Sequence, residues 1–398
     1  MMTKIYNNFG RIIFSLLLRK FMRIGITLKT PDGFSHDLTQ DNAVPEIKIS
    51  VNNWTFFWDL LIGYDLGFAE SYLNGKWDCR DLPGLFRHLS KSRSDNLFSR
   101  LLNYSPNKFR ARISQRMRSS NTLVWASRNV REHYDLSNEF FSLFLDPSMT
   151  YSSAVYKSDD QNLEEAQISK LDILLSRGQL QPSDHILDIG CGWGSLGLRA
   201  AKEYNCKVTG LTLSKNQYSY VRELVDRSQL AGKIKVKLLD YRKLEGVFNH
   251  IYAVEMLEAV GHVGIDQFFL KCSKLLADNG SLQIQVITVP DNRYESYRNN
   301  CDFIQKYIFP GGMLPSREII EKSAKKNGFE LTHSNSLRKH YEQTLRTWRS
   351  NLLERWDENQ VSGFGLRDYR KFYYYFSYCE GAFASQHIDN YQLSFKKH

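Results

Sequence analysis

The sequence contains no run of 18 consecutive apolar residues, so no segment is expected to span a bilayer. Cysteine is scarce: the six cysteines are scattered, and no pair has the C-x-x-C spacing. The absence of closely spaced cysteine pairs argues against both a zinc site and a disulfide framework, and it agrees with a reducing cytoplasm. Internal repeats and low-complexity tracts are also absent. We therefore expect an ordinary globular protein without a structural metal, and 398 residues suffice for two domains.

Positive charge is in excess, with a formal net charge of +10 and a pI of about 9.1. A basic surface suits nucleic acid or anionic lipid, and charge alone does not choose between them. Residues 11–23 are basic and apolar. A signal peptide fits them poorly, because the apolar run is short and no small-residue cleavage site follows. An amphipathic surface helix fits better, either packed on its own domain or in contact with a membrane.

The pattern divides the chain into a smaller N-terminal α+β domain, residues 1–120, and a larger domain, residues 121–398. The first is expected to contain a hairpin at residues 46–62, where aromatic side chains are dense, and to end in a basic, serine-rich linker at residues 90–120. The second alternates strand and helix, which is typical of a mostly parallel sheet covered on both faces. The expected seven strands are residues 185–189, 207–213, 234–240, 250–256, 283–288, 330–337 and 391–395. Insertions at 290–325 and 339–388 follow the fifth and sixth strands, where open α/β sheets build substrate pockets.

The most informative stretch is residues 186–194, ILDIGCGWG. It is typical of a strand that ends in a glycine-spaced turn, and a helical pattern follows at once. Such glycines let the backbone approach a ligand closely, and the helix offers unpaired N–H groups. The next strand ends in Thr212-Leu213-Ser214 and not in the acidic residue expected about 20 residues on in a nicotinamide binder. Together with the rest of the chain, this pattern favours S-adenosylmethionine.

Further motifs lie where such a site would be. They are residues 133–136 with 147–154, residues 212–217, residues 255–262 and residues 378–383. On these motifs the chain resembles the cyclopropane-fatty-acyl-phospholipid synthases, relatives of the mycolic acid cyclopropane synthases. The resemblance covers almost the whole chain. It includes residues 65–78, a segment that the mycolic enzymes lack, and residues 302–312, which resemble the family's turn over the active site.

The resemblance implies a class I methyltransferase fold that transfers a methyl group from S-adenosylmethionine to the double bond of an unsaturated acyl chain. An alkene is a poor nucleophile and must be held in line with the methyl sulfonium. Attack leaves a carbocation, which aromatic rings can stabilise, and a base must then take a proton so that the ring closes. In the family this base is a bicarbonate ion.

Site residues are carried over by position. Glu258 matches the glutamate that holds bicarbonate, Tyr341 the tyrosine, and Cys379 the cysteine often marked as the active-site residue. Ser153 stands where many members have cysteine, and Gln285 where some have histidine. Both can still donate hydrogen bonds to an oxyanion. The departures leave a methyl- or methylene-branching enzyme, or a non-catalytic lipid-binding relative, as alternatives. Each assignment also has a structural alternative: Cys379 in particular fits an ordinary buried cysteine, because the alkene chemistry needs no thiol.

For S-adenosylmethionine, the resemblance implies contacts from five parts of the chain: Tyr151 and Ser152; Asp188; Gly190, Cys191, Gly192 and Gly194; Thr212, Leu213 and Gln217; and Tyr241 with Arg242. The expected partner is an unsaturated phospholipid at the inner face of a membrane, with the enzyme cytoplasmic and peripherally attached, and a homodimer is a reasonable expectation. A nucleic-acid methyltransferase is disfavoured, because no asparagine–proline–proline–tyrosine type motif follows the fourth strand.

Overall fold

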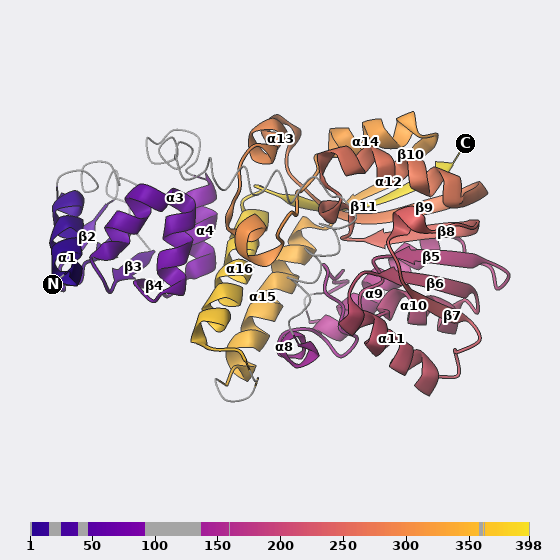
Figure 1. The fold of residues 1–398 in the computed structure, drawn as a ribbon, viewed down its shortest axis with the longest axis horizontal. Helices are drawn as coiled ribbons and strands as arrows, with labels where there is room; N and C mark the ends of the chain where they lie inside the picture. The colour runs from indigo at the N-terminus through magenta and orange to yellow at the C-terminus, as the bar shows by residue number, and fades with distance from the viewer. Residues whose placement is uncertain are drawn as a thin grey trace.

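The computed structural model describes residues 2–15, 25–38, 47–91, 137–158, 160–357, 361 and 363–397, with side chains from residue 8 on. These residues form an N-terminal and a C-terminal lobe, each built on its own sheet (Figure 1). In the N-terminal lobe the strand order is β2-β1-β3-β4, with β1 parallel to β3 and the other pairs antiparallel. Its elements are α1 (Met2–Ile13), β1 (Thr27–Lys29), β2 (Ser35–Asp37), β3 (Lys48–Val51), α3 (Thr55–Leu73), β4 (Trp77–Cys79) and α4 (Leu82–Lys91).

The hairpin predicted at residues 46–62 is wrong in its second half. Residues 48–51 form β3, but the aromatic segment begins helix α3. Aromatic residues favour strands only when they lie on a pleated, half-buried surface. Here Phe56 and Phe57 are fully buried, and the Phe56 ring packs 6.2 Å from that of Trp77. The side chain of Asn53 accepts a hydrogen bond from the Thr55 N–H at the helix start. Tertiary packing thus outweighed local propensity.

Four expectations lie wholly or partly outside the described residues. Of the predicted basic, apolar helix, α1 contains residues 11–13, and residues 16–24 are not described. The linker from residue 92 on, the domain boundary at residue 120 and the motif at 133–136 are not described either. Among the helices that are described, none is long and apolar enough to cross a membrane.

The C-terminal lobe contains the predicted seven-stranded sheet, in the order β10-β11-β9-β8-β5-β6-β7. Neighbouring strands are parallel from β9 to β7, whereas β11 is antiparallel to both β9 and β10. All seven strands lie where the sequence pattern puts them, although β9 begins earlier than expected. Their bounds are β5 (His185–Ile189), β6 (Lys207–Thr212), β7 (Ile234–Leu238), β8 (Phe248–Val254), β9 (Leu276–Thr288), β10 (Phe329–Ser336) and β11 (Asp389–Lys397).

Helices cover both faces of this sheet (Figure 1). One face packs on α9 (Leu163–Arg177), α10 (Ser195–Glu203) and α11 (Lys215–Arg227), and the other on α12 (Gly261–Leu275) and α14 (Arg317–Lys326). The chain before α9 contains the short helix α8 (Asn138–Ser142). Three short helices lie in the connections: η3 (Tyr241–Lys243), η4 (Leu257–Ala259) and η5 (Ile304–Ile308).

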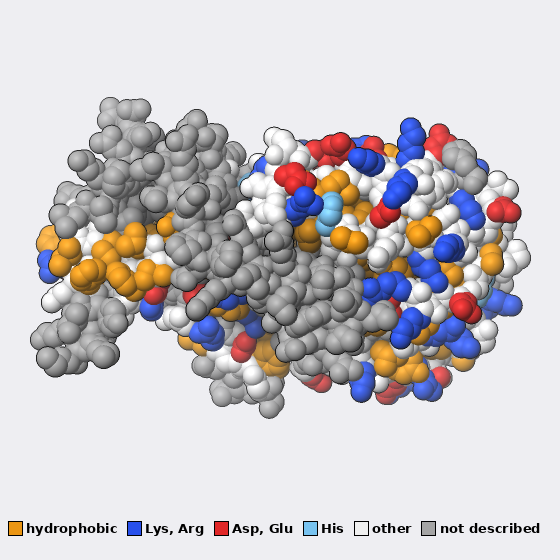
Figure 2. All heavy atoms as spheres, turned by 45° about the horizontal axis from the view of Figure 1, so that its top comes forward, with side chains coloured by type: hydrophobic (Ala, Val, Ile, Leu, Met, Phe, Trp, Pro, Cys, Tyr) orange, Lys and Arg blue, Asp and Glu red, His pale blue; other side chains and the backbone are white. Residues whose placement is uncertain are grey.

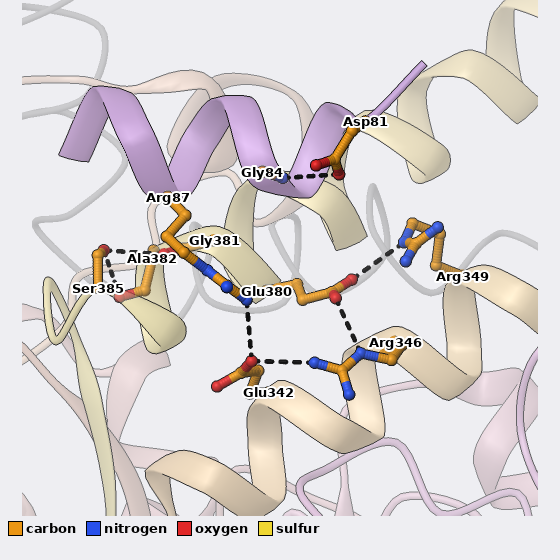
Figure 3. A network of polar contacts seen from close by, with 10 residues as sticks. All are labelled: Asp81, Gly84, Arg87, Glu342, Arg346, Arg349, Glu380, Gly381, Ala382 and Ser385. Atoms are coloured by element: carbon orange, nitrogen blue, oxygen red, sulfur yellow. Dashed lines mark hydrogen bonds and ion pairs between the residues drawn. The ribbon is translucent and has the colours of Figure 1, made fainter. Parts of the chain in front are cut away.

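Apart from α14, the helices of the two insertions form a layer between the sheet and the N-terminal lobe (Figure 1). The insertions contribute α13 (Asp291–Arg298), α15 (Arg338–Arg355) and α16 (Leu366–Ala384) to this layer. An ion network holds this layer together (Figure 3). Glu380 of α16 is buried and pairs with Arg346 and Arg349 of α15, while Glu342 of α15 pairs with Arg346 and with Arg87 of α4. The ion pair between Arg87 and Glu342 therefore connects the N-terminal lobe to α15, one of the helices formed by the insertions.

Candidate active site

A cavity of about 780 Å³ opens at the carboxyl ends of β5, β6 and β8, bounded on its other side by the insertions. This is where ligands bind in open α/β sheets. Its wall contains most of the predicted site residues: Tyr151, Ser152, Asp188, Gly190, Cys191, Gly192, Thr212, Leu213, Gln217, Tyr241, Arg242, Glu258, Tyr341 and Cys379. Gly194, Ser153 and Gln285 are not among the residues that line the cavity.

The glycine turn connects β5 to α10 as predicted, and its backbone requires glycine. Gly190 and Gly194 have φ of +79° and +89°, a region that other residues rarely adopt. A Cβ on Gly194 would also lie 3.1 Å from the side chain of Val221 on α11. The turn thus keeps open a backbone surface beside the cavity.

Asp188, near the end of β5, supplies a buried carboxyl group at this turn. Its Oδ2 atom is buried and has no hydrogen-bond partner among the described residues. Burial raises the pKa of this carboxyl to about 7, and the charge of Lys170 opposes the rise. A buried polar atom without a partner is costly, so a ligand that brings N–H donors would satisfy it. The methionine end of S-adenosylmethionine brings such donors, and this part of the site fits it.

The turns after β6 and β7 are ordered by local hydrogen bonds. The Thr212 hydroxyl donates to Gln217 Oε1 at 2.8 Å, and the side chain of Ser214 caps helix α11. After β7, the carboxylate of Asp240 forms an ion pair of 2.6 Å with Arg242, and both residues line the cavity. Sequence reasoning named Arg242 and missed Asp240, although Asp240 is the last residue of the expected strand at 234–240, at its carboxyl end, which was a usable signal.

Lys170 is a second residue that sequence reasoning missed. It is fully buried on α9, where a lysine would ordinarily be expected on the solvent side. Its Nζ donates to Ser152 Oγ at 2.7 Å. Burial lowers the pKa of the Lys170 amine to about 8, while Glu255, Asp146 and Asp188 oppose this shift. The lysine therefore holds the predicted Ser152 contact by a hydrogen bond and lies within the electrostatic reach of three carboxylates.

The predicted anion-holding residues do come together, but around Glu255. Glu255 Oε1 accepts hydrogen bonds from the Ser153 backbone N–H at 3.0 Å, from Gln285 Nε2 at 3.0 Å and from Asn390 Nδ2 at 2.7 Å. Its Oε2 accepts from the Tyr341 hydroxyl at 2.7 Å. Sequence reasoning missed both Glu255 and Asn390, although Glu255 belongs to the same motif as Glu258.

Glu258 lies beside this cluster and has different partners. Its Oε1 accepts the Ile287 backbone N–H at 2.6 Å, and its Oε2 is buried with no partner among the described residues. Burial, and then the charge of Glu255, raise the pKa of Glu258 to about 8. The carboxyl of Glu258 is therefore held mainly in its neutral form at pH 7, chiefly because its surroundings disfavour the charged form.

A bicarbonate ion does not fit the donors assigned to it. The backbone of Ser153 and the side chains of Gln285 and Tyr341 already bind the Glu255 carboxylate. These donors have the chemistry of an oxyanion site, but the chain's own glutamate fills that site.

Cys379 lines the cavity from α16, and burial raises the pKa of its thiol well above 9.0. A neutral thiol is a poor nucleophile. Cys379 therefore forms part of the cavity wall, and its surroundings do not activate it as a nucleophile.

In the part of the chain that the structure describes, no group of three or more His, Cys, Asp or Glu residues could hold a metal ion.

The strand order, the glycine turn and the cavity together define a class I methyltransferase that uses S-adenosylmethionine. The chain belongs to the mycolic acid cyclopropane synthetase family, whose model matches residues 122–393. It is a member of a family of S-adenosylmethionine-dependent enzymes that act on lipids.

Two curated relatives from Mycobacterium tuberculosis illustrate the range. Tuberculostearic acid methyltransferase UfaA1 is 36% identical over 339 residues, which cover 82% of this chain and 78% of the relative. Cyclopropane mycolic acid synthase 1 is 37% identical over 281 residues, which cover 68% of this chain and 96% of the relative. Among solved structures, cyclopropane synthase MmaA2 from the same organism aligns with a TM-score of 0.64 at 35% identity, over 68% of this chain and 98% of that one.

Proposed function

We propose that the enzyme methylates the double bond of an unsaturated phospholipid acyl chain and closes the product to a cyclopropane. Bound S-adenosylmethionine supplies the methyl group as an electrophile. The observation that carries the proposal is that the cavity lined by the predicted cofactor contacts is also lined by aromatic side chains. Tyr151, Tyr375, Tyr378, Phe309 and Phe383 all line it.

Aromatic rings suit this chemistry, because their faces attract a cation without reacting with it. Burial raises the pKa of the Tyr375 hydroxyl well above 10.0, so its ring stays neutral. The Tyr151 hydroxyl donates to that of Tyr375 at 3.4 Å, which orients the two rings within one wall. Apolar, aromatic surroundings also exclude water, which would otherwise trap a carbocation.

Two observations support a phospholipid substrate at a membrane surface: the net positive charge and the exposed hydrophobic side chains of the N-terminal lobe. The net charge of +10 favours an anionic bilayer. Hydrophobic side chains gather on the N-terminal lobe (Figure 2), where Phe9 and Ile12 of α1 and Leu61 and Ile62 of α3 are exposed. A peripheral enzyme at the inner face of a cytoplasmic membrane would use such a surface to reach an acyl chain.

Mass spectrometry of the lipid product tests the proposal. Purified protein would be incubated with S-adenosylmethionine and vesicles of mono-unsaturated phospholipid. We expect acyl chains that are heavier by one CH₂ and have lost the double bond. Unchanged acyl chains, with S-adenosylmethionine still bound, would overturn the phospholipid proposal for these substrates.

A methyl- or methylene-branching reaction is the second candidate. It is favoured by Ser153 and Gln285, the two departures from the resembled pattern, and by the match to a tuberculostearic acid methyltransferase over 82% of this chain. The same experiment separates the two, because a chain heavier by CH₂ that keeps an unsaturation is a methylene-branched product.

A further inference from the structure

The carboxylate of Glu255 fills what we call the anion seat, the position enclosed by the hydrogen-bond donors of Ser153, Gln285, Tyr341 and Asn390. Four donors converge on its carboxylate, from the segments around residues 153, 285, 341 and 390. Ionised carboxylates accept hydrogen bonds at two oxygens, and charge-assisted hydrogen bonds are the strong ones. The site is therefore built for a negative charge, and the chain supplies that charge itself.

The orientation of Gln285 is fixed toward this seat. Its Nε2 donates both to Glu255 and to the Ser153 carbonyl oxygen, at 3.1 Å. Its Oε1 accepts from Gln392 Nε2 at 3.1 Å. Turning the amide over would set oxygen against two acceptors and nitrogen against a donor. The glutamine is thus locked as a donor to Glu255.

The backbone of Glu255 carries an independent sign of a specialised position. Glu255 directly follows β8 and has φ of +50°, a left-handed conformation that is uncommon for residues other than glycine. Such conformations cost free energy and cluster at functional sites. Its N–H donates to the Gln285 carbonyl oxygen at 2.7 Å, which holds the residue in this conformation.

One face of the carboxylate is available to the cavity. Glu255 lines the cavity beside Tyr341 and Glu258. Its Oε1 accepts three hydrogen bonds from the described residues, whereas Oε2 accepts one. An ionised oxygen can accept more than one bond, so Oε2 has room for a proton.

We propose that Glu255 is the proton acceptor of the reaction and makes the enzyme independent of bicarbonate. This inference rests on the proposed function for the reaction it assists. In the step, the transferred methyl carbon is bonded to one former alkene carbon and the other carries the positive charge. Glu255 Oε2 takes one proton from that methyl group. The electron pair of the broken C–H bond forms the bond to the cationic carbon and closes the ring. The protonated Glu255 later releases its proton to solvent.

Two substitutions of Glu255 distinguish the loss of the carboxylate as a proton acceptor from the emptying of the anion seat. Glu255→Ala removes the carboxylate and leaves its donors in place, so a small carboxylate from solution can enter. Glu255→Gln keeps the seat filled with a neutral amide that cannot accept the proton. Glu223→Ala, which removes an exposed glutamate on α11, is the matched control.

Activity would be measured in buffer freed of carbon dioxide, with and without bicarbonate or formate. We expect the wild type and Glu223→Ala to be active without either anion. Glu255→Ala should lose at least 100-fold and regain activity with either anion, as expected for the loss of a general base. Glu255→Gln should lose as much and not be rescued. A wild type that needs bicarbonate, or a Glu255→Ala variant that stays fully active without any added anion, would overturn the inference.

A binding experiment tests the seat without turnover. Titration calorimetry with formate, in the presence of S-adenosylhomocysteine, should show saturable binding to Glu255→Ala and none to the wild type. Equal S-adenosylhomocysteine affinity in all proteins would show that the variants are folded. If the wild type turns over no unsaturated lipid, the proposed function fails, while the formate result still decides whether Glu255 fills the anion seat. Formate binding to the wild type, or its absence from a folded Glu255→Ala, contradicts the inference.

Discussion

Gly381 of α16 lies directly against Phe86 of α4, so that a Cβ on Gly381 would come within 2.6 Å of the Phe86 Cβ. The same Cβ would lie 2.7 Å from the Arg87 backbone nitrogen. The glycine is thus required by the close approach of two helices, one from each lobe. This contact also places α16, whose Tyr378 and Cys379 line the cavity.

Gly381→Ala should therefore weaken the packing of α4 on α16. Overpacking of this kind costs about 1–3 kcal/mol, which would lower the Tm by several degrees. Gly63→Ala is the control, because Gly63 lies in α3, next to the kink at Tyr64, and a Cβ added there would meet nothing within 4 Å. Thermal unfolding of both variants would be compared with that of the wild type. Equal Tm values for the two variants would refute this account of the helix contact.

Glu258 predicts a pH dependence of stability. Its pKa is raised from 4.5 to about 8 in the folded protein, so the folded state holds a proton that the unfolded state releases above pH 4.5. Stability from this group is present below pH 4.5 and is lost as the pH rises toward 8. Glu258→Gln resembles the neutral acid and should fall less steeply in Tm between pH 5 and 8 than the wild type. Parallel Tm curves for the two proteins would contradict the raised pKa.

Asp188 should determine cofactor affinity. Asp188→Asn removes the carboxyl group at the glycine turn, and hydrogen bonds to charged groups contribute roughly 1.5–3 kcal/mol. We expect S-adenosylhomocysteine to bind about 10- to 100-fold more weakly, as measured by titration calorimetry. Asp172→Asn is the control, because Asp172 pairs with Arg199 on the surface of α9 and does not line the cavity. An unchanged Kd for Asp188→Asn would remove this residue from the cofactor site.

Some of the architecture could be predicted because its signals are local. The alternation of strand and helix and the glycine turn at 186–194 depend on near neighbours, and the seven strands were found within a few residues except at the start of β9. The aromatic segment of α3 could not be assigned in the same way, since burial of Phe56 and Phe57 against distant residues decides its conformation.

In the candidate site, too, some features follow from local sequence and others depend on contacts between distant residues. The sequence by itself determined which motifs meet at the sheet edge, because the carboxyl ends of parallel strands lie side by side. It did not determine which of two glutamates three residues apart fills the anion seat. The turn after β8 directs Glu255 toward donors from four distant segments, including Asn390, and leaves Glu258 with the Ile287 backbone. Only the tertiary structure decided this, because hydrogen bonding depends on where side chains converge in space and not on their spacing along the chain.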